Sequence, residues 1–147
     1  MKLNNVLILN KTIFLNSQQK KCIVMKQYHL LIVDDEQRFA NMLAKRLSLR
    51  GCHCDVCYNG EQALDLVRQK DFFLILLDLR LPDIYGIEVL ERIKLISAIT
   101  PVVILTAHGT EEDRRACMQQ GAYAFWHKPL VIDELMSILA RIGEMSP

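Results

Sequence analysis

A run of six apolar residues, Phe72–Leu77, ends directly in a carboxylate, Asp78. An unbroken apolar stretch of this length, followed by Pro82 and Gly86, predicts a strand that is buried on both faces. Such strands belong to parallel sheets covered by helices on both sides, and these sheets bind ligands at the carboxyl ends of their strands. The sequence therefore places Asp78 at the edge of the sheet where an α/β protein keeps its chemistry.

Composition limits what kind of protein this is. The 147 residues are enough for one domain with a real core, and the 51% hydrophobic and 24% charged fractions are ordinary for a soluble fold. A net charge of +1 gives no reason to expect direct contact with nucleic acid or with a membrane surface. No apolar run approaches the ~20 residues that span a bilayer. Five cysteines, an odd number, fit a reducing cytoplasm better than a disulfide scaffold, so we expect a cytoplasmic protein.

Strand and helix patterns alternate along most of the chain. The predicted strands, besides the one that ends at Asp78, are Tyr28–Val33, Cys52–Cys57, Val102–Leu105 and Tyr123–Trp126. The predicted helices are Gln37–Arg50, Glu61–Gln69, Ile87–Ile96, a segment between a capping-box-like Thr110–Asp113 and Gly121, and Asp133–Ile142. Five alternations predict an α/β fold with a doubly wound, five-stranded parallel sheet and helices on both faces.

Residues 1–26 do not follow this pattern. Their apolar stretches are broken by Asn10 and Lys11, and they lack the features of a signal peptide. We expect either a short strand or helix lying on the domain or a mobile leader of unknown role, and Met25 is a plausible alternative start. The domain itself is expected over residues 27–143, with a short tail at 144–147 and no second domain after it.

Four of the five predicted strands end in chemically useful side chains: Asp34 and Asp35, Asp78, Thr106, and Lys128. The ends of parallel strands meet at one edge, so these groups should form a cluster. Crowded carboxylates repel one another, and a hard divalent cation relieves the repulsion; Mg²⁺ suits a few carboxylates plus water. A carboxylate nucleophile beside a cation, an ammonium and a hydroxyl is a layout for phosphoryl transfer.

The arrangement resembles the receiver domain of two-component response regulators, the family of the bacterial chemotaxis regulator. The motifs are Asp34-Asp35, Asp78-x-x-x-Pro82 with Gly86, Thr106-Ala107 and Lys128-Pro129, in order and each after the expected strand. Each motif alone is weak, but together they are specific, and they cover about residues 27–143. The resemblance implies a flavodoxin-like sheet with strand order 2-1-3-4-5.

The resemblance also implies a role for each site residue. Asp78 would accept a phosphoryl group from the phosphohistidine of a sensor histidine kinase or a histidine phosphotransfer protein. Asp35, Asp78 and the backbone carbonyl of Arg80 would bind Mg²⁺ directly, and Asp34 would assist through water. Lys128 would pair with the phosphoryl oxygens. The domain would catalyse only its own phosphorylation and dephosphorylation, so it is not expected to be an enzyme in the usual sense.

In the family a hydroxyl and an aromatic ring relay the change to a binding face. Here these residues are Thr106, which would bond a phosphoryl oxygen, and Phe125, whose ring would turn inward and remodel the face formed by the fourth helix, fifth strand and fifth helix. The Lys128–Pro129 bond would be cis. Arg80 and His108 occupy positions that tune hydrolysis. The output would be contact with a downstream protein that the sequence does not identify.

Two other functions fit part of the pattern. A Mg²⁺-dependent phosphatase of the haloacid dehalogenase type also uses Asp, Thr and Lys, but it places an Asp-x-Asp nucleophile first, whereas here the acidic pair leads and Asp78-Leu79-Arg80 lacks the second Asp. A receiver-like binding module that works without phosphorylation is the second alternative, and the intact set of reactive residues argues against it.

The cysteines suggest a zinc site that we do not favour. Cys54 and Cys57 lie near His53, but residues three apart on a strand point to opposite faces, and no second Cys-x-x-Cys is present. We expect these thiols to be small core or surface residues.

Overall fold

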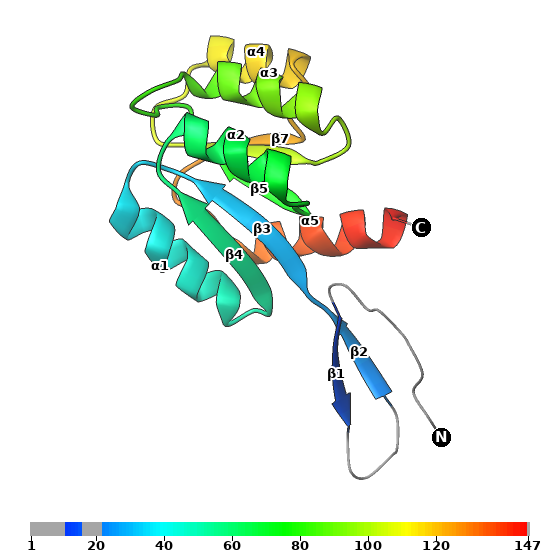
Figure 1. Ribbon diagram of the computed structural model, residues 1–147. Helices are drawn as coiled ribbons and strands as arrows, with labels where there is room; N and C mark the ends of the chain where they lie inside the picture. Colours follow the sequence, from blue (N-terminus) through cyan, green and yellow to red (C-terminus); the bar gives the residue numbers. More distant parts are fainter. Residues whose placement is uncertain (1–10, 16–21, 147) are drawn as a thin grey trace.

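The protein folds as a five-stranded parallel sheet with helices on both faces, as the computed structural model in Figure 1 shows. The structure describes residues 11–15 and 22–146. The five strands of this sheet are β3 (Tyr28–Val33), β4 (Cys52–Cys57), β5 (Leu74–Leu77), β6 (Val102–Thr106) and β7 (Ala124–His127). Their spatial order is β4-β3-β5-β6-β7, which is the expected order 2-1-3-4-5 with every neighbouring pair parallel.

The helices alternate with these strands and divide between the two faces. They are α1 (Gln37–Ser48), α2 (Gly60–Gln69), α3 (Gly86–Ile96), α4 (Glu111–Gln119) and α5 (Ile132–Met145). Side chains of α1 and α5 pack on one face of the sheet, and side chains of α2, α3 and α4 pack on the other. None of the helices in the described part of the chain has the length and apolar character needed to cross a bilayer.

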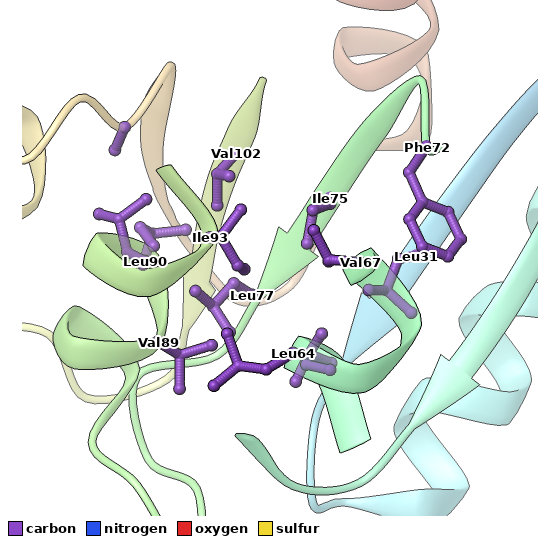
Figure 2. Packing of buried hydrophobic residues seen from close by; sticks show 14 of the residues in the cluster. Leu31, Leu64, Val67, Phe72, Ile75, Leu77, Val89, Leu90, Ile93 and Val102 are labelled. Carbon is purple, nitrogen blue, oxygen red and sulfur yellow. The ribbon is translucent and has the colours of Figure 1, made fainter. Parts of the chain in front are cut away.

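The apolar run before Asp78 forms the central strand, and it is buried on both faces as predicted. Ile75 and Leu77 belong to the hydrophobic cluster under α2 and α3, which Figure 2 shows from close by. Leu74 and Leu76 belong to the cluster under α1 and α5. All four side chains are 0–1% exposed. Burial of successive residues on alternate faces explains why this strand reads as a continuous apolar run.

The structure moves several element ends by one to three residues. The central strand begins at Leu74, so Phe72 and Phe73 precede it, although the amide N–H of Phe73 still donates to the carbonyl of His29. The last strand is Ala124–His127, one residue later than predicted. The first helix ends at Ser48 because Gly51, with φ of +83°, turns the chain away. The last helix continues to Met145, three residues past its predicted end at Ile142.

Part of the expected leader forms a separate two-stranded antiparallel sheet. β1 (Lys11–Leu15) pairs with β2 (Cys22–Lys26), with Lys11 opposite Lys26 and Leu15 opposite Cys22. Of the alternatives left open for the leader, these two segments are strands. Residues 1–10 and 16–21 of the leader, and residue 147 of the tail, lie outside the described residues.

Candidate functional site

The five strand-end residues meet at the carboxyl edge of the sheet because the backbone ladder continues past the strands. The amide N–H of Asp34 donates to the carbonyl of Cys57, and that of Asp78 donates to the carbonyl of Val33. The amide N–H of Lys128 donates to the carbonyl of Thr106 in the same way. Asp34, Asp78 and Lys128 therefore start from backbone positions that a neighbouring strand fixes.

Lys128 joins the acidic groups of this edge. Its Nζ lies 2.6 Å from Oδ2 of Asp34 and 3.2 Å from Oδ2 of Asp78. Asp34 and Asp78 are buried, and the lysine side chain itself is only 10% exposed. Its peptide bond to Pro129 is cis, as the resemblance implied. One ammonium thus neutralises two carboxylates from different strands.

Two further residues of the same region contact the ammonium of Lys128. Oε1 of Glu36 is 3.1 Å from Nζ, and the ring centroid of Phe39 lies 4.4 Å from it, within reach of a cation–π interaction. Neither Glu36 nor Phe39 was predicted from the sequence to belong to the site. The position of Glu36 directly after the acidic pair was the one signal available.

Burial and charge shift the pKa values of the Asp34–Lys128 pair. Burial raises the pKa of Asp34 above its usual range; the contacts with Lys128 and with the amide of Glu36 oppose this effect without cancelling it. Burial lowers the pKa of Lys128, but the carboxylates of Asp34 and Asp78 outweigh burial, and the pKa of Lys128 is raised. Lys128 therefore remains a cation throughout the physiological range.

The acidic residues have the composition of a site for a hard cation. Carboxylate oxygens of Asp34, Asp35 and Asp78 all lie within 4.8 Å of one another. Asp35 is exposed while the other two are buried, so the cluster is open to solvent on one side. An all-oxygen donor set that is partly open to water fits Mg²⁺, which retains several water ligands.

A cavity of about 210 Å³ opens beside Asp78. It is lined by Asp35, Glu36, Asp78, Arg80, Thr106, Ala107 and His108. Oδ1 of Asp78 accepts a long hydrogen bond, 3.4 Å, from the amide N–H of Arg80, and Oγ1 of Thr106 accepts one of 3.5 Å from the amide of His108. The structure thus brings Arg80, Thr106 and His108 to the same opening as Asp78.

Phe125 and Thr106 both lie against Gly109, which has no side chain to separate them. A Cβ atom added at Gly109 would collide with the tip of the Phe125 ring and would come within 2.8 Å of Cγ2 of Thr106. The ring is half-buried, packs against the cluster under α2 and α3, and makes an edge contact with His127. Thr106, at the end of β6, and Phe125, the predicted switch residue, are therefore closely packed.

A second glycine lets α3 begin against the backbone of Asp78. The amide of Gly86 donates to the carbonyl of Leu79, and a Cβ at Gly86 would lie 2.5 Å from the carbonyl oxygen of Asp78. Next to it, the hydroxyl of Tyr85 donates to Oδ1 of Asp113 at 3.2 Å. Asp113 also completes the predicted capping box with Thr110 at the start of α4.

Comparison with known proteins gives a consistent result. The sequence model of the response regulator receiver domain matches residues 30–140. The "uncharacterized transcriptional regulatory protein YkoG" of Bacillus subtilis (strain 168) is 37% identical over 118 residues, which is 80% of this chain and 50% of that protein. The "sensory/regulatory protein RpfC" of Xanthomonas campestris is 37% identical over 125 residues, 81% of this chain and 17% of that protein.

Solved structures agree on the fold. The CheY-like response regulator receiver domain protein from Methanospirillum hungatei JF-1 superposes with a TM-score of 0.78 and 22% identity. The match covers 82% of this chain and all of that one. By contrast, this chain spans half or less of the two curated relatives above.

Proposed function

Because the chain belongs to the response regulator receiver domain family, we propose that it is a phosphoacceptor of a two-component phosphorelay. Asp78 is the acceptor, and the donor is the phosphohistidine of a sensor histidine kinase or a histidine phosphotransfer protein. The contact of Lys128 with both Asp34 and Asp78, beside the cavity that Thr106 and His108 line, is the observation that carries the proposal.

The residues around Asp78 prepare it as a nucleophile. An oxygen of Asp78 attacks phosphorus while the bond from phosphorus to the donor nitrogen breaks, and an acyl phosphate forms. Asp78 is buried beneath the opening, with one oxygen held by Lys128 and the other by the amide of Arg80, so the carboxylate presents a fixed orientation. Fixing the nucleophile in advance removes orientational entropy from the barrier.

Positive charge must meet the oxygens of the incoming group. Lys128 needs only to exchange its contact with Asp34 for one with a phosphoryl oxygen, because it already touches Asp78. Asp35, Asp78 and the carbonyl of Arg80 would hold Mg²⁺, with Asp34 acting through water. Bound there, the cation would neutralise charge that develops on the transferring group.

The phosphoryl group would then change the α4–β7–α5 face. The hydroxyl of Thr106 lines the cavity and can donate to a phosphoryl oxygen once it turns away from the amide of His108. Its methyl group and the Phe125 ring flank Gly109, so a rotation of Thr106 alters the space available to the ring. This packing supports the proposal that Thr106 and Phe125 form the switch for binding a downstream protein.

The location and the tuning residues complete the proposal. Arg80 and His108 are exposed at the rim of the cavity, where they would control the access of water to the acyl phosphate. Cys52, Cys54, Cys57 and Cys117 are free thiols, which supports action in a reducing cytoplasm.

The proposal is tested with a phosphoryl mimic. Beryllofluoride with Mg²⁺ should raise the melting temperature of the wild-type domain, because a ligand that binds the folded state alone stabilises it. Asp78→Asn should not respond, whereas Asp71→Asn, which changes an exposed carboxylate between α2 and β5, should respond like the wild type. Mass spectrometry after incubation with phosphoramidate should find one phosphoryl group in the wild type and none in Asp78→Asn.

A response in Asp78→Asn equal to that of the wild type would show that another residue accepts the group. If the wild type takes up neither mimic nor phosphoryl group, the domain works as a binding module without phosphorylation.

A further inference from the structure

Two histidines and an aspartate gather at the opposite end of the sheet from Asp78. His29 on β3 and His53 on β4 are register partners, and Asp55 lies two residues farther along β4 on the same face. His29 precedes Asp34 by five positions, roughly 16 Å at the usual rise per residue of a strand. β4 is the edge strand, so the cluster is open to solvent on one side.

The polar atoms of this cluster converge. Nε2 of His29 lies 3.3 Å from Oδ2 of Asp55, and Nε2 of His53 lies 3.7 Å from Oδ1 of the same carboxylate. One ligand atom from each of the three residues can be chosen so that all lie within 4.8 Å of one another. The side chains of His29 and Asp55 are 21% and 18% exposed, and that of His53 is 62% exposed.

His29 is held in place but is not satisfied. The centroid of its ring is 4.7 Å from that of the His53 ring and 4.8 Å from that of the Phe72 ring. Despite its closeness to Asp55, Nε2 of His29 makes no hydrogen bond of acceptable geometry. It is the one buried side-chain nitrogen or oxygen without a partner among the described residues. A buried imidazole nitrogen normally has a hydrogen-bond partner, and this one has the Asp55 carboxylate 3.3 Å away as an ion-pair contact instead.

We propose that His29, His53 and Asp55 bind a borderline divalent metal ion, with Zn²⁺ the best match. Two imidazole nitrogens and one carboxylate oxygen are zinc ligands, and a water molecule would fill the fourth position of the tetrahedron. Zinc ligands lie about 2.0–2.2 Å from the metal, which puts them roughly 3.3–3.5 Å from one another. The His29–Asp55 distance already fits, and rotation of the exposed His53 side chain closes the remainder.

The His29–His53–Asp55 cluster prefers a different metal ion from the acidic site, and the nearby cysteines are not part of it. Mg²⁺ prefers oxygen ligands and so favours the Asp34–Asp35–Asp78 end, whereas imidazole suits zinc. Cys54 packs in the cluster on the other face of the sheet. Cys57 shares the face of Asp55, but its Sγ contacts the carbonyl of Asn59, and burial raises the pKa of its thiol to about 12.

Lys70 forms an ion pair with the carboxylate of Asp55 in this structure. Its Nζ is 2.9 Å from Oδ2 of Asp55, and its side chain is 47% exposed, so it can move into solvent. Its positive charge opposes a metal ion at the same oxygen. Removing this charge should therefore strengthen metal binding, an effect opposite to the loss expected from removing a ligand.

Calorimetric titration of the whole chain with Zn²⁺ in saturating Mg²⁺ tests the proposal, because Mg²⁺ occupies the acidic end. Loss of an outer-sphere partner alone weakens metal sites about 10–100-fold, so His53→Gln, which removes a ligand, should weaken binding at least tenfold. His127→Gln, an exposed histidine on β7, is the matched control and should bind as the wild type does. Lys70→Met should bind more tightly than the wild type.

Imidazole ¹H–¹⁵N spectra locate the metal independently of affinity. Zinc should shift the signals of His29 and His53 and leave those of His108 and His127 in place. Equal zinc affinity in the wild type and His53→Gln would overturn the proposal, as would shifts at His108 alone. The phosphoryl-mimic response of Asp78 should persist in His53→Gln, so the two proposals fail separately.

Discussion

The ammonium of Lys128 lies closer to Asp34 than to Asp78, at 2.6 Å against 3.2 Å. Asp34, which the resemblance expects to assist Mg²⁺ through water, is therefore the closest partner of Lys128 in this structure. A carboxylate as buried as Asp34 needs a counter-charge, since removing one partner of a buried ion pair leaves a charge without compensation. Lys128 stabilises the fold in this state, and it is close enough to Asp78 to serve the chemistry.

Lys128→Met should destabilise the domain in the absence of divalent cations by about 3 kcal/mol, the usual cost of breaking a buried pair. Mg²⁺ should recover more stability in the variant than in the wild type, because it supplies the missing positive charge between the same carboxylates. Urea unfolding with and without Mg²⁺ measures both effects. An equal gain from Mg²⁺ in the two proteins would contradict this account. If the proposed phosphorelay function holds, Lys128→Ala should still accept a phosphoryl group at Asp78, but phosphorylation should no longer raise its affinity for the downstream protein.

Gly86→Ala should lower the stability of the domain and displace Asp78, the proposed phosphoacceptor. The new Cβ would lie 2.5 Å from the carbonyl oxygen of Asp78 and from Cα of Leu79, and these backbone atoms cannot move without moving the Asp78 loop. Overpacking of this kind costs about 1–3 kcal/mol. We expect a lower urea midpoint together with a weaker response to beryllofluoride. A variant that lost stability yet kept the full mimic response would show that α3 shifts instead of the loop.

The sequence was sufficient to predict the fold and the meeting of Asp34, Asp78, Thr106 and Lys128 at one end of the sheet. Each of Asp34, Asp78 and Thr106 ends an apolar run, and a parallel sheet brings such ends together whatever the details of packing. The capping box at Thr110 and the turn at Gly121 are also local signals, and both are present in the structure.

The remaining features depend on distant contacts that a linear pattern does not contain. The pairing of Lys128 with Asp34 and Glu36 depends on side-chain positions just past the ends of two separate strands, β7 and β3. The closeness of His29 to Asp55 depends on the register of β3 against β4, which places His29 opposite His53. Sequence reasoning considered His53 only with the cysteines of its own strand, and it missed the histidine on the neighbouring one.

Gly109→Ala should displace the Phe125 ring and leave the backbone unchanged, because the colliding atoms are the far end of that ring and the Thr106 methyl group. The variant should fold, and the Phe125 ring resonances should move toward those of a more exposed ring. Trp126, the single tryptophan, adjoins Phe125 on β7, and its fluorescence should respond less to beryllofluoride than in the wild type.

A second substitution serves as the control for this steric explanation. Phe125→Leu makes room for the added methyl group, so the stability changes of Gly109→Ala and Phe125→Leu should be non-additive, as for residues in contact. Additive changes, or unmoved Phe125 resonances in Gly109→Ala, would mean that the two residues are not coupled through packing.

Asp83 connects the loop after β5 to the start of α2 by hydrogen bonds. Replacing its carboxylate should change how the stability of the domain depends on pH. Its carboxylate accepts hydrogen bonds from the amides of Gly60 and Glu61, at 2.8 and 2.9 Å. Burial acts to raise the pKa of Asp83, but these amide contacts outweigh it and hold the pKa below its usual range. The stabilisation is thus present above the unfolded-state pKa of about 3.9 and is lost as the pH falls through the folded-state pKa. Asp83→Asn should lower the free energy of unfolding by about 1 kcal/mol at pH 7, as loss of a helix cap does.

Urea unfolding from pH 7 down to pH 3 should show the free energies of unfolding of wild type and Asp83→Asn converging at the acid end. Asp71→Asn is the control. A constant difference in free energy between wild type and Asp83→Asn across this range would show that the charge of the carboxylate contributes nothing.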